Sequence, residues 1–184
     1  MLAFFSNLVG KATEKQLVFL WLIFCFVALT YKLGGVPPYH TDENFYVESS
    51  RNMVESGDYL TPIYHDKKRF AKPILYYWFV SASYRIFGVN LASARLASAF
   101  FGSLTIGLLY LISSRLFEGR IAFYSILILP ATFLHFQLSR RATTDIVMSF
   151  FILLGLFFLC VRIRVIFRTI LISIYFTWQW RWGV

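Results

Sequence analysis

Two adjacent carboxylates, Asp42 and Glu43, stand about ten residues beyond the first long apolar run of the chain. A carboxylate at a membrane surface can act as a general base toward a membrane-bound substrate, or it can bind a metal ion. The same pair can also form the solvated start of a helix, because the positive end of a helix dipole stabilises nearby carboxylates. Both interpretations are open at this point.

Cations gather later in the same segment, at Lys67, Lys68, Arg69 and Lys72. Lysine and arginine hold phosphate groups through charge-assisted hydrogen bonds. They also form belts that contact anionic lipid headgroups at the membrane surface. We therefore expect these cations either to clamp a phosphate or to lie along the lipid interface.

A third carboxylate, Asp145, follows Thr144 and precedes another apolar run. Either residue can cap the helix that starts there, and an acid at the mouth of a membrane helix is also a functional candidate. His40 and His65 lie in the same segment as the acid pair and are candidate metal ligands. His135 lies within an apolar run and is predicted to pack there.

The composition indicates an integral membrane protein. Of 184 residues, 58% are apolar and 15% are charged, and the mean hydropathy is +0.63, whereas soluble domains are about 45–50% apolar and about 25% charged. An aromatic content of 20% excludes disorder. The net charge of +9 flanks apolar blocks, which favours a membrane over a nucleic acid as partner. Cys25 and Cys160 lie inside apolar blocks and are predicted to pack there.

Charge-free windows predict the membrane spans, since a spanning helix needs about 17–25 mostly apolar residues. Four windows qualify, at Gln16–Tyr31, Leu96–Ser114, Ile121–Ser139 and Ile146–Val161, and a fifth span is expected around Thr169–Trp180. The first window could also belong to a signal peptide, but the residues after it fit a cleavage site poorly. Pro73–Phe87 is short and rich in Tyr and Trp, which predicts a helix at the membrane surface.

The positive-inside rule supports this topology. With a cytoplasmic N-terminus and a surface helix at Pro73–Phe87, Arg115 and Arg120 fall in a cytoplasmic loop. The acid pair and Asp145 then lie together on the external side. Arg85 and Arg95 flank the start of the second span and are expected to anchor it at the interface.

The external segment should contain a helix over Glu43–Ser56. Its apolar and small residues recur on one face at Tyr46, Val47, Ser50, Met53 and Val54. Thr41 or Asp42 can cap its start, and Gly57 can end it. The expected fold class is therefore an all-α integral membrane protein with about five transmembrane helices and two surface helices in the first external loop.

The order of several short motifs resembles the N-terminal part of the GT-C membrane glycosyltransferases. These motifs are Asp42-Glu43-Asn44-Phe45-Tyr46, Glu55-Ser56-Gly57-Asp58-Tyr59-Leu60-Thr61-Pro62, Phe70-Ala71-Lys72-Pro73, Phe87-Gly88-Val89-Asn90, Ala94-Arg95-Leu96 and Ala142-Thr143-Thr144-Asp145. They are most similar to the branch of bacterial aminoarabinose transferases of lipid A and, more distantly, to protein O-mannosyltransferases. The resemblance implies sugar transfer from a polyprenyl-phosphate donor to a lipid, glycan or protein acceptor. It implies a site that faces the periplasm, or the ER lumen in a eukaryote, and the expected location is the bacterial inner membrane. No nucleic-acid partner is expected, because the cations flank apolar blocks.

The resemblance also assigns roles to single residues. Asp42 carries over as the base, Glu43 as its neighbour and Asp145 as the acid of the second external loop. Tyr46, in the same motif as Asp42, is expected to position the substrate. Lys72 is expected to contact the donor phosphate, and Arg69 to join it in stabilising the leaving group.

Two departures from the family pattern shape the expectations. Ala71 stands where the aminoarabinose branch has a metal-binding glutamate, so a divalent metal ion is expected only if the histidines compensate. The family members are also several times longer. Residues 1–161 are therefore expected to form an N-terminal GT-C-like module, followed by an atypical tail over residues 162–184. Truncation of the chain, or a non-catalytic role in binding polyprenyl phosphate or a partner protein, is the alternative expectation.

Overall fold

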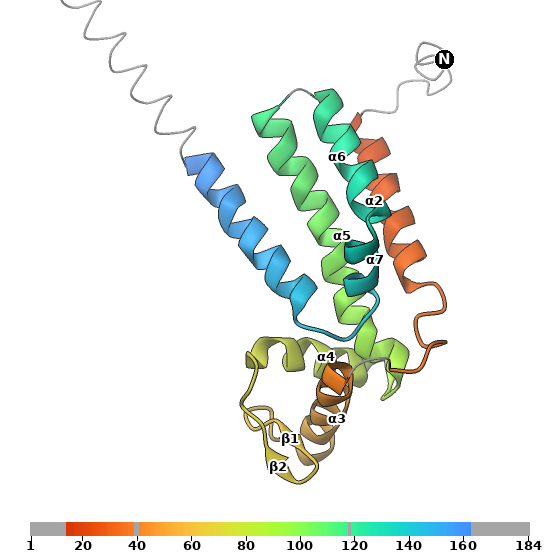
Figure 1. The fold of residues 1–184 in the computed structure, drawn as a ribbon, viewed down its shortest axis with the longest axis vertical. Coiled ribbons are helices and arrows are strands. Elements are labelled where there is room, and N and C mark those ends of the chain that lie inside the picture. Colours follow the sequence, from red (N-terminus) through yellow and green to blue (C-terminus); the bar gives the residue numbers. More distant parts are fainter. Residues whose placement is uncertain (1–13, 39–40, 118, 163–184) are drawn as a thin grey trace, which may run out of the picture.

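The computed structural model describes residues 14–38, 41–117 and 119–162, which form seven helices and one small hairpin. The helices are α2 (Glu14–Thr30), α3 (Thr41–Ser56), α4 (Ile74–Phe87), α5 (Leu91–Leu116), α6 (Gly119–Ala131), α7 (Phe133–Ser139) and an unlabelled last helix over Asp145–Arg162; the strands are β1 (Ile63–Tyr64) and β2 (Lys67–Lys68). Figure 1 shows two regions. A helical bundle of α2, α5, α6, α7 and the last helix stands above a juxtamembrane module of α3, the hairpin and α4.

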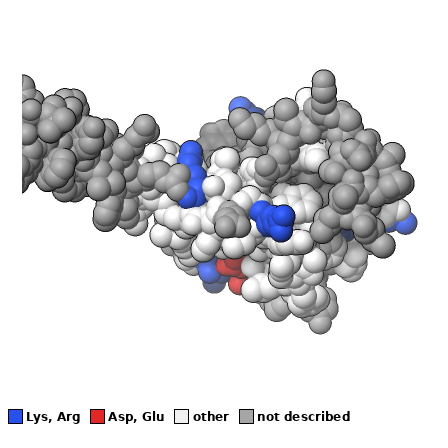
Figure 2. Space-filling model, turned by 90° about the horizontal axis from the view of Figure 1, so that it is seen from above, with Lys and Arg blue, Asp and Glu red and all other residues white. Residues whose placement is uncertain are grey.

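The bundle contains the helices that can cross a membrane. Length and apolar composition qualify α5, with 26 residues, and the last helix, with 18. α2 is apolar but has 17 residues, at the lower limit for a span. Seen along the bundle from the end opposite the module, the described surface shows few charged side chains (Figure 2). The expected fifth span and the tail fall on residues 163–184, outside the described part of the chain.

The window predicted as one span over Ile121–Ser139 is broken. α6 and α7 meet at an angle of 65°, so the prediction of one continuous helix is wrong. Pro130 lies in the last turn of α6, and proline removes a helical N–H and crowds the preceding turn. Thr132 then starts the new direction: its N–H and its hydroxyl both donate to the Leu129 carbonyl.

The two helices predicted within the first external segment are present, as α3 and α4. α4 has 14 residues, begins directly after Pro73, ends at Gly88 and lies across the end of the bundle in Figure 1. α3 ends at Ser56, followed by Gly57 with a positive φ of 76°, a conformation that favours glycine. The predicted inner face of α3 is also confirmed, since Tyr46, Ser50 and Met53 are buried.

A hairpin between α3 and α4 departs from the all-helical expectation. Ile63 pairs with Lys68 and Tyr64 pairs with Lys67 in an antiparallel ladder. The two residues between the strands, His65 and Asp66, both have positive φ, as two-residue hairpin turns require. This tight turn presents the cations of the loop on one small surface.

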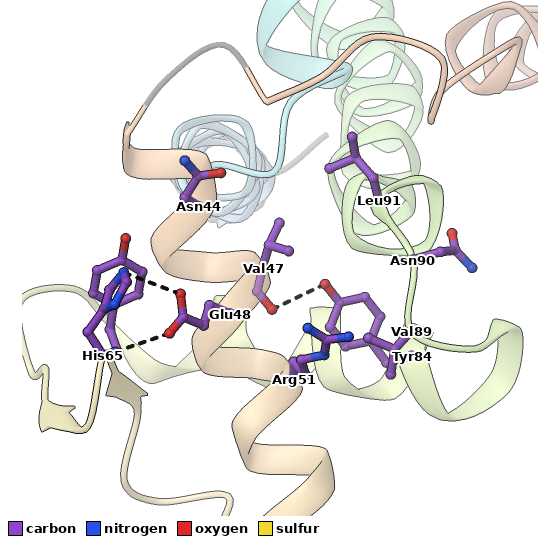
Figure 3. A pocket seen from close by; sticks show the side chains of 10 residues that line it. Asn44, Val47, Glu48, Arg51, His65, Tyr84, Val89, Asn90 and Leu91 are labelled. Carbon is purple, nitrogen blue, oxygen red and sulfur yellow. Dashed lines mark hydrogen bonds and ion pairs between the residues drawn. The ribbon is translucent and has the colours of Figure 1, made fainter.

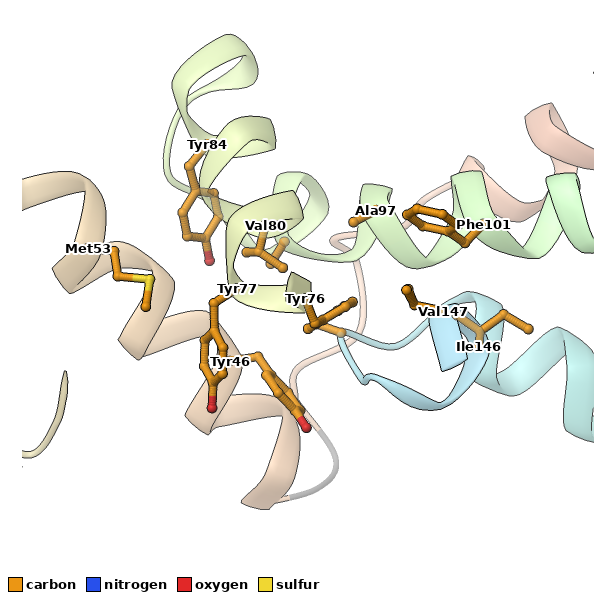
Figure 4. Close-up of a cluster of buried hydrophobic side chains, with 12 residues drawn as sticks. Tyr46, Met53, Tyr76, Tyr77, Val80, Tyr84, Ala97, Phe101, Ile146 and Val147 are labelled. Atoms are coloured by element: carbon orange, nitrogen blue, oxygen red, sulfur yellow. The ribbon is translucent and has the colours of Figure 1, made fainter. Parts of the chain in front are cut away.

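One core joins the module to the bundle. Buried tyrosines of α3 and α4 meet Ala97 and Phe101 of α5 and Ile146 and Val147 of the last helix (Figure 4). The rings of Tyr46 and Tyr76 meet edge to face, with centroids 4.9 Å apart. The residues predicted to do chemistry therefore sit on elements that share a single packed interior.

Candidate active site

The Tyr46 hydroxyl links the helix that carries Asp42 to the segment that carries Asp145. Tyr46 is one turn beyond Asp42 on α3, and its hydroxyl forms a 3.2 Å hydrogen bond with the Thr144 hydroxyl, next to Asp145. Burial, together with the negative charges of Tyr77, Asp42 and Asp145, raises the pKa of Tyr46 to about 12, against a lowering by Thr144. Asp42 and Asp145 themselves are exposed. Two solvent-exposed carboxylates, one on α3 and one at the start of the last helix, are thus near enough to this tyrosine for their charges to affect its ionisation.

Arg69 lies on the hairpin side of this group. Its guanidinium stacks over the Phe45 ring, 3.3 Å from the ring centre, and Phe45 in turn meets Tyr64 edge to face. Burial raises the pKa of Tyr77, although the nearby charge of Arg69 acts to lower it. Hydrogen bonding between the Arg69 side chain and the Tyr77 hydroxyl also acts to lower the pKa of Tyr77. The guanidinium therefore lies beside the Tyr77 hydroxyl, and a guanidinium can bind an anionic ligand.

A basic cavity of about 480 Å³ continues from Arg69 along the hairpin. It is lined by Tyr64, His65, Lys67, Lys68 and Arg69. Lys72 is exposed on the segment between the hairpin and α4. Within the described chain no contact joins Lys72 to Asp42 or Asp145, so its approach to the donor remains a prediction.

Glu43 is held in a different way from Asp42. Its side chain is fully buried and pairs with Arg95 through two hydrogen bonds, Nε to Oε1 at 2.6 Å and Nη2 to Oε2 at 2.9 Å. The Ala142 N–H also donates to Oε1, at 2.9 Å. Both carboxylate oxygens are therefore engaged within the protein.

Arg95 corrects one expectation. It was expected to anchor the helix at the interface, but its side chain is buried, with 4% of its surface exposed. Its Nη1 donates to the carbonyls of Leu33 and Val36 at 2.7 and 2.8 Å. The helix begins five residues earlier than its charge-free window because Asn90 caps it, accepting from the Ser93 N–H. Ala94 and Ser98, which flank Arg95, are a signal that was missed, since such small residues let other segments approach a helix closely.

The described residues do not form a metal site. No group of three or more His, Cys, Asp or Glu side chains comes together in residues 14–38, 41–117 and 119–162. His40 lies outside the described residues. His65 instead interacts with Glu48, through its N–H at 3.1 Å and its Nε2 at 3.7 Å.

A second cavity, also about 480 Å³, lies against a different face of α3. Asn44, Val47, Glu48 and Arg51 face it (Figure 3), and Tyr84 at its edge donates to the Val47 carbonyl at 3.3 Å. Neither Asp42 nor Asp145 lines this cavity. It is therefore distinct from the group around Tyr46.

A family match and similar sequences show which proteins this chain is related to. The family described as dolichyl-phosphate-mannose-protein mannosyltransferase matches residues 71–174, more than half of the chain. An uncharacterized protein of Aquifex aeolicus is 38% identical over 69% of this chain and 26% of its own length. The undecaprenyl phosphate-alpha-4-amino-4-deoxy-L-arabinose arabinosyl transferase of Photorhabdus laumondii is 32% identical over 73% of this chain and 24% of its own length.

A solved structure has the same fold in this region. ArnT from Cupriavidus metallidurans bound to undecaprenyl phosphate superposes with a TM-score of 0.73 and 30% identity, covering 80% of this chain and 27% of its own. The chain spans about a quarter of the length of these relatives. The fold, the apolar helices and the sequence match agree: the chain is an integral membrane protein that belongs to the dolichyl-phosphate-mannose-protein mannosyltransferase family of lipid-linked sugar glycosyltransferases.

Proposed function

We propose that this chain contributes to an external active site that transfers a sugar from a polyprenyl-phosphate donor to a lipid, glycan or protein acceptor. The observation that carries the proposal is the 3.2 Å hydrogen bond between the Tyr46 and Thr144 hydroxyls, which joins the first turns of the Asp42 helix to the residue before Asp145. The donor class is supported by the similarity to an ArnT structure bound to undecaprenyl phosphate. We place the protein in the bacterial inner membrane with this site facing the periplasm.

The transfer step follows from the charges of the site. The Asp42 carboxylate takes the proton of an acceptor hydroxyl or amine, whose electron pair then forms a bond to the anomeric carbon of the sugar. The bond from that carbon to the donor phosphate oxygen breaks, and its electron pair leaves with the phosphate. The leaving group gains negative charge, so it requires cations rather than a general acid.

The remaining residues serve the two substrates. Arg69 and Lys72 stabilise the charge that grows on the phosphate through charge-assisted hydrogen bonds. Asp145 contributes a second carboxylate, which positions the substrate. Tyr46 binds the Thr144 hydroxyl and so holds the segment that carries Asp145. Glu43, whose carboxylate is bonded within the protein, supports the neighbouring Asp42.

A transfer assay tests the proposal. The full 184-residue chain in proteoliposomes would receive a panel of radiolabelled polyprenyl-phosphate sugars, and both donor breakdown and labelled acceptor would be followed. Replacing Asp42 by Asn should lower turnover about 10²–10⁴-fold, the usual contribution of a general base. Donor binding and folding should persist, because Asp42 is exposed.

Asp66→Asn is the matched control. It removes the same charge from the exposed hairpin turn, and asparagine tolerates the positive φ of that position. Its turnover should equal that of the wild type. Full turnover by Asp42→Asn would contradict the role of Asp42 as base. Donor binding by a folded wild-type chain that breaks down no donor would instead favour a non-catalytic lipid-phosphate-binding protein.

A further inference from the structure

We infer that Arg95 is a positioning residue, whose ion pair with Glu43 fixes Asp42 and Asp145 relative to each other. We call Glu43, Arg95 and the backbone groups that they bind the Glu43–Arg95 junction. The inference rests on the proposed function, because it concerns the geometry of the two acids. It adds a residue from α5 that contacts neither substrate.

The junction fixes the start of α3 on one side. Glu43 is the residue after Asp42 in the first turn of the helix, and its carboxylate is clamped in plane by the Arg95 guanidinium. A bidentate guanidinium pair sets direction as well as distance, which a lysine cannot do. The backbone that carries Asp42 therefore has a defined place against α5.

The same carboxylate fixes the approach to Asp145 on the other side. Ala142, three residues before Asp145, is fully buried, and its N–H donates to Glu43 Oε1. The Met148 N–H donates back to the Thr144 carbonyl in the first turn of the last helix. Figure 4 shows the start of this helix packed beside α3 and α5. One oxygen atom thus links the backbones that carry the two acids.

The remaining donors of Arg95 extend the junction to a third segment. Nη1 binds the carbonyls of Leu33 and Val36, in the stretch that leads from α2 to α3. Buried ion pairs are often no more stabilising than apolar residues of similar size. An apolar pair would lack the directional hydrogen bonds by which Glu43 and Arg95 join three separate segments. The junction is thus better suited to setting geometry than to adding stability.

The first experiment separates position from stability. Replacing both partners by methionine, Glu43→Met with Arg95→Met, leaves no unpaired buried charge, so the protein should fold. We expect kcat to fall at least about tenfold, because small misplacements of reacting groups are costly. The donor KM should change less than about threefold, since Arg69 and Lys72 lie elsewhere.

Two further variants sharpen this result. The matched control, Arg51→Met with Glu55→Met, removes an exposed ion pair from the same helix and should retain the wild-type kcat. The swap Glu43→Arg with Arg95→Glu restores opposite charges, but a guanidinium on α3 has no oxygen that can accept from the Ala142 N–H. The swapped variant should therefore remain slow. Wild-type kcat in the swap would overturn the inference.

The second experiment needs no turnover. Spin labels at Asn44→Cys and Ser149→Cys, both exposed positions, would report the distance between α3 and the last helix, with Cys25 and Cys160 replaced by alanine. The distance distribution should be narrow in the wild type and in the Arg51–Glu55 control. It should broaden or shift in the methionine pair.

The two readouts distinguish the failure of each proposal. A wild-type chain that is inactive with every donor would defeat the proposed function, while the distance measurement would still decide whether the junction fixes the two helices. An unchanged distance in the methionine pair would overturn the positioning role, whatever the turnover. A changed distance with lost kcat and retained donor KM is the result that we expect.

Discussion

The juxtamembrane module and the helical bundle each bury one charged side chain among the described residues, an acid (Glu43) in the module and a base (Arg95) in the bundle. The module hides polar groups in its interior, namely Glu43, Ser49, Ser50, Ser81 and Ser83. The bundle displays large apolar side chains on its outside, among them Phe19, Leu20 and Phe24 of α2 and Phe151, Ile152 and Leu156 of the last helix. Both regions also bury small polar side chains, such as Ser98 and Ser103 of α5, and the module exposes Phe70 and Trp78, so the two regions differ in the sign of their buried charge rather than in how polar their interiors are.

α5 joins the two regions. Near its start, the Ser93 carbonyl accepts from the Ser83 hydroxyl at 2.7 Å and Arg95 pairs with Glu43. Further along, the helix packs by small residues, and 61% of its apolar window is buried against 11% for the last helix. The comparison teaches that the two opposite buried charges of the described chain, Glu43 and Arg95, are placed where they neutralise each other, at the joint between the two regions.

The largest effect on stability should come from Arg95→Ala. This change leaves the Glu43 carboxylate buried and unpaired, and breaking a buried ion pair in this way costs about 3–5 kcal/mol of unfolding free energy. Reversible unfolding in lipid-like micelles would measure the loss. A cost below about 1 kcal/mol, the size expected for an exposed pair, would mean that the buried Glu43–Arg95 pair contributes no more to stability than an exposed ion pair.

Alkaline pH should destabilise the module selectively. Burial raises the pKa values of Tyr46 and Tyr84 to about 12, against about 10 in an unfolded chain. The unfolded state then loses protons first, so the free energy of unfolding should be constant below about pH 10 and fall between about pH 10 and about pH 12.

Tyrosine absorbance and unfolding followed over that pH range would check this prediction. Replacing both residues by phenylalanine should reduce the slope of the pH profile, while Tyr76 and Tyr77, whose pKa values burial also raises, should account for the remaining slope. Equal loss of stability in this double variant would show that the titrating groups lie elsewhere.

Gly102→Ala tests packing inside the bundle. A methyl group at Gly102 would meet the Ser139 side chain, with its Cβ only 2.7 Å away, so α5 and α7 would have to separate. Overpacking of this kind costs about 1–3 kcal/mol. Turnover should fall less than in Arg95 variants, because the contact lies away from the two acids. Unfolding measurements on the wild type and on Gly107→Ala would provide the reference.

Arg51→Ala should have the smallest effect. Its ion pair with Glu55 is 3.3 Å long and both side chains are more than half exposed, and exposed helical pairs contribute about 0.3–0.5 kcal/mol. Thermal unfolding at low and high salt would show a difference that salt removes. A loss as large as that of Arg95→Ala would erase the contrast between buried and exposed pairs.

The elements were easier to predict from the sequence than the contacts between them. The face of α3 followed from its periodicity, and the surface position of α4 followed from its short length and its Tyr and Trp content. The bend after Pro130 was missed because proline is common within membrane helices and the window around it is uniformly apolar.

The site illustrates the same limit. Topology alone predicted that Asp42 and Asp145 share one side of the membrane. Nothing local in the sequence predicted that Tyr46 would reach Thr144 or that Arg95 would be buried, because a cation at the edge of an apolar window is usually an interface anchor. Such contacts join segments from 52 to 99 residues apart and depend on the packing of the whole chain.

The shared oxygen of Glu43 also sets an order of events during biosynthesis. Arg95 lies 52 residues after Glu43 in the sequence, and Ala142 lies 99 residues after Glu43. At synthesis rates of about 5–20 residues per second, Arg95 is therefore synthesised about 3–10 s after Glu43, and Ala142 about 5–20 s after Glu43. Until then the Glu43 carboxylate must stay in water, because an unpaired charge is costly in hydrocarbon. α3 can dock fully only after α5, α6 and α7 have entered the membrane, which makes the candidate site one of the last parts of this region to assemble.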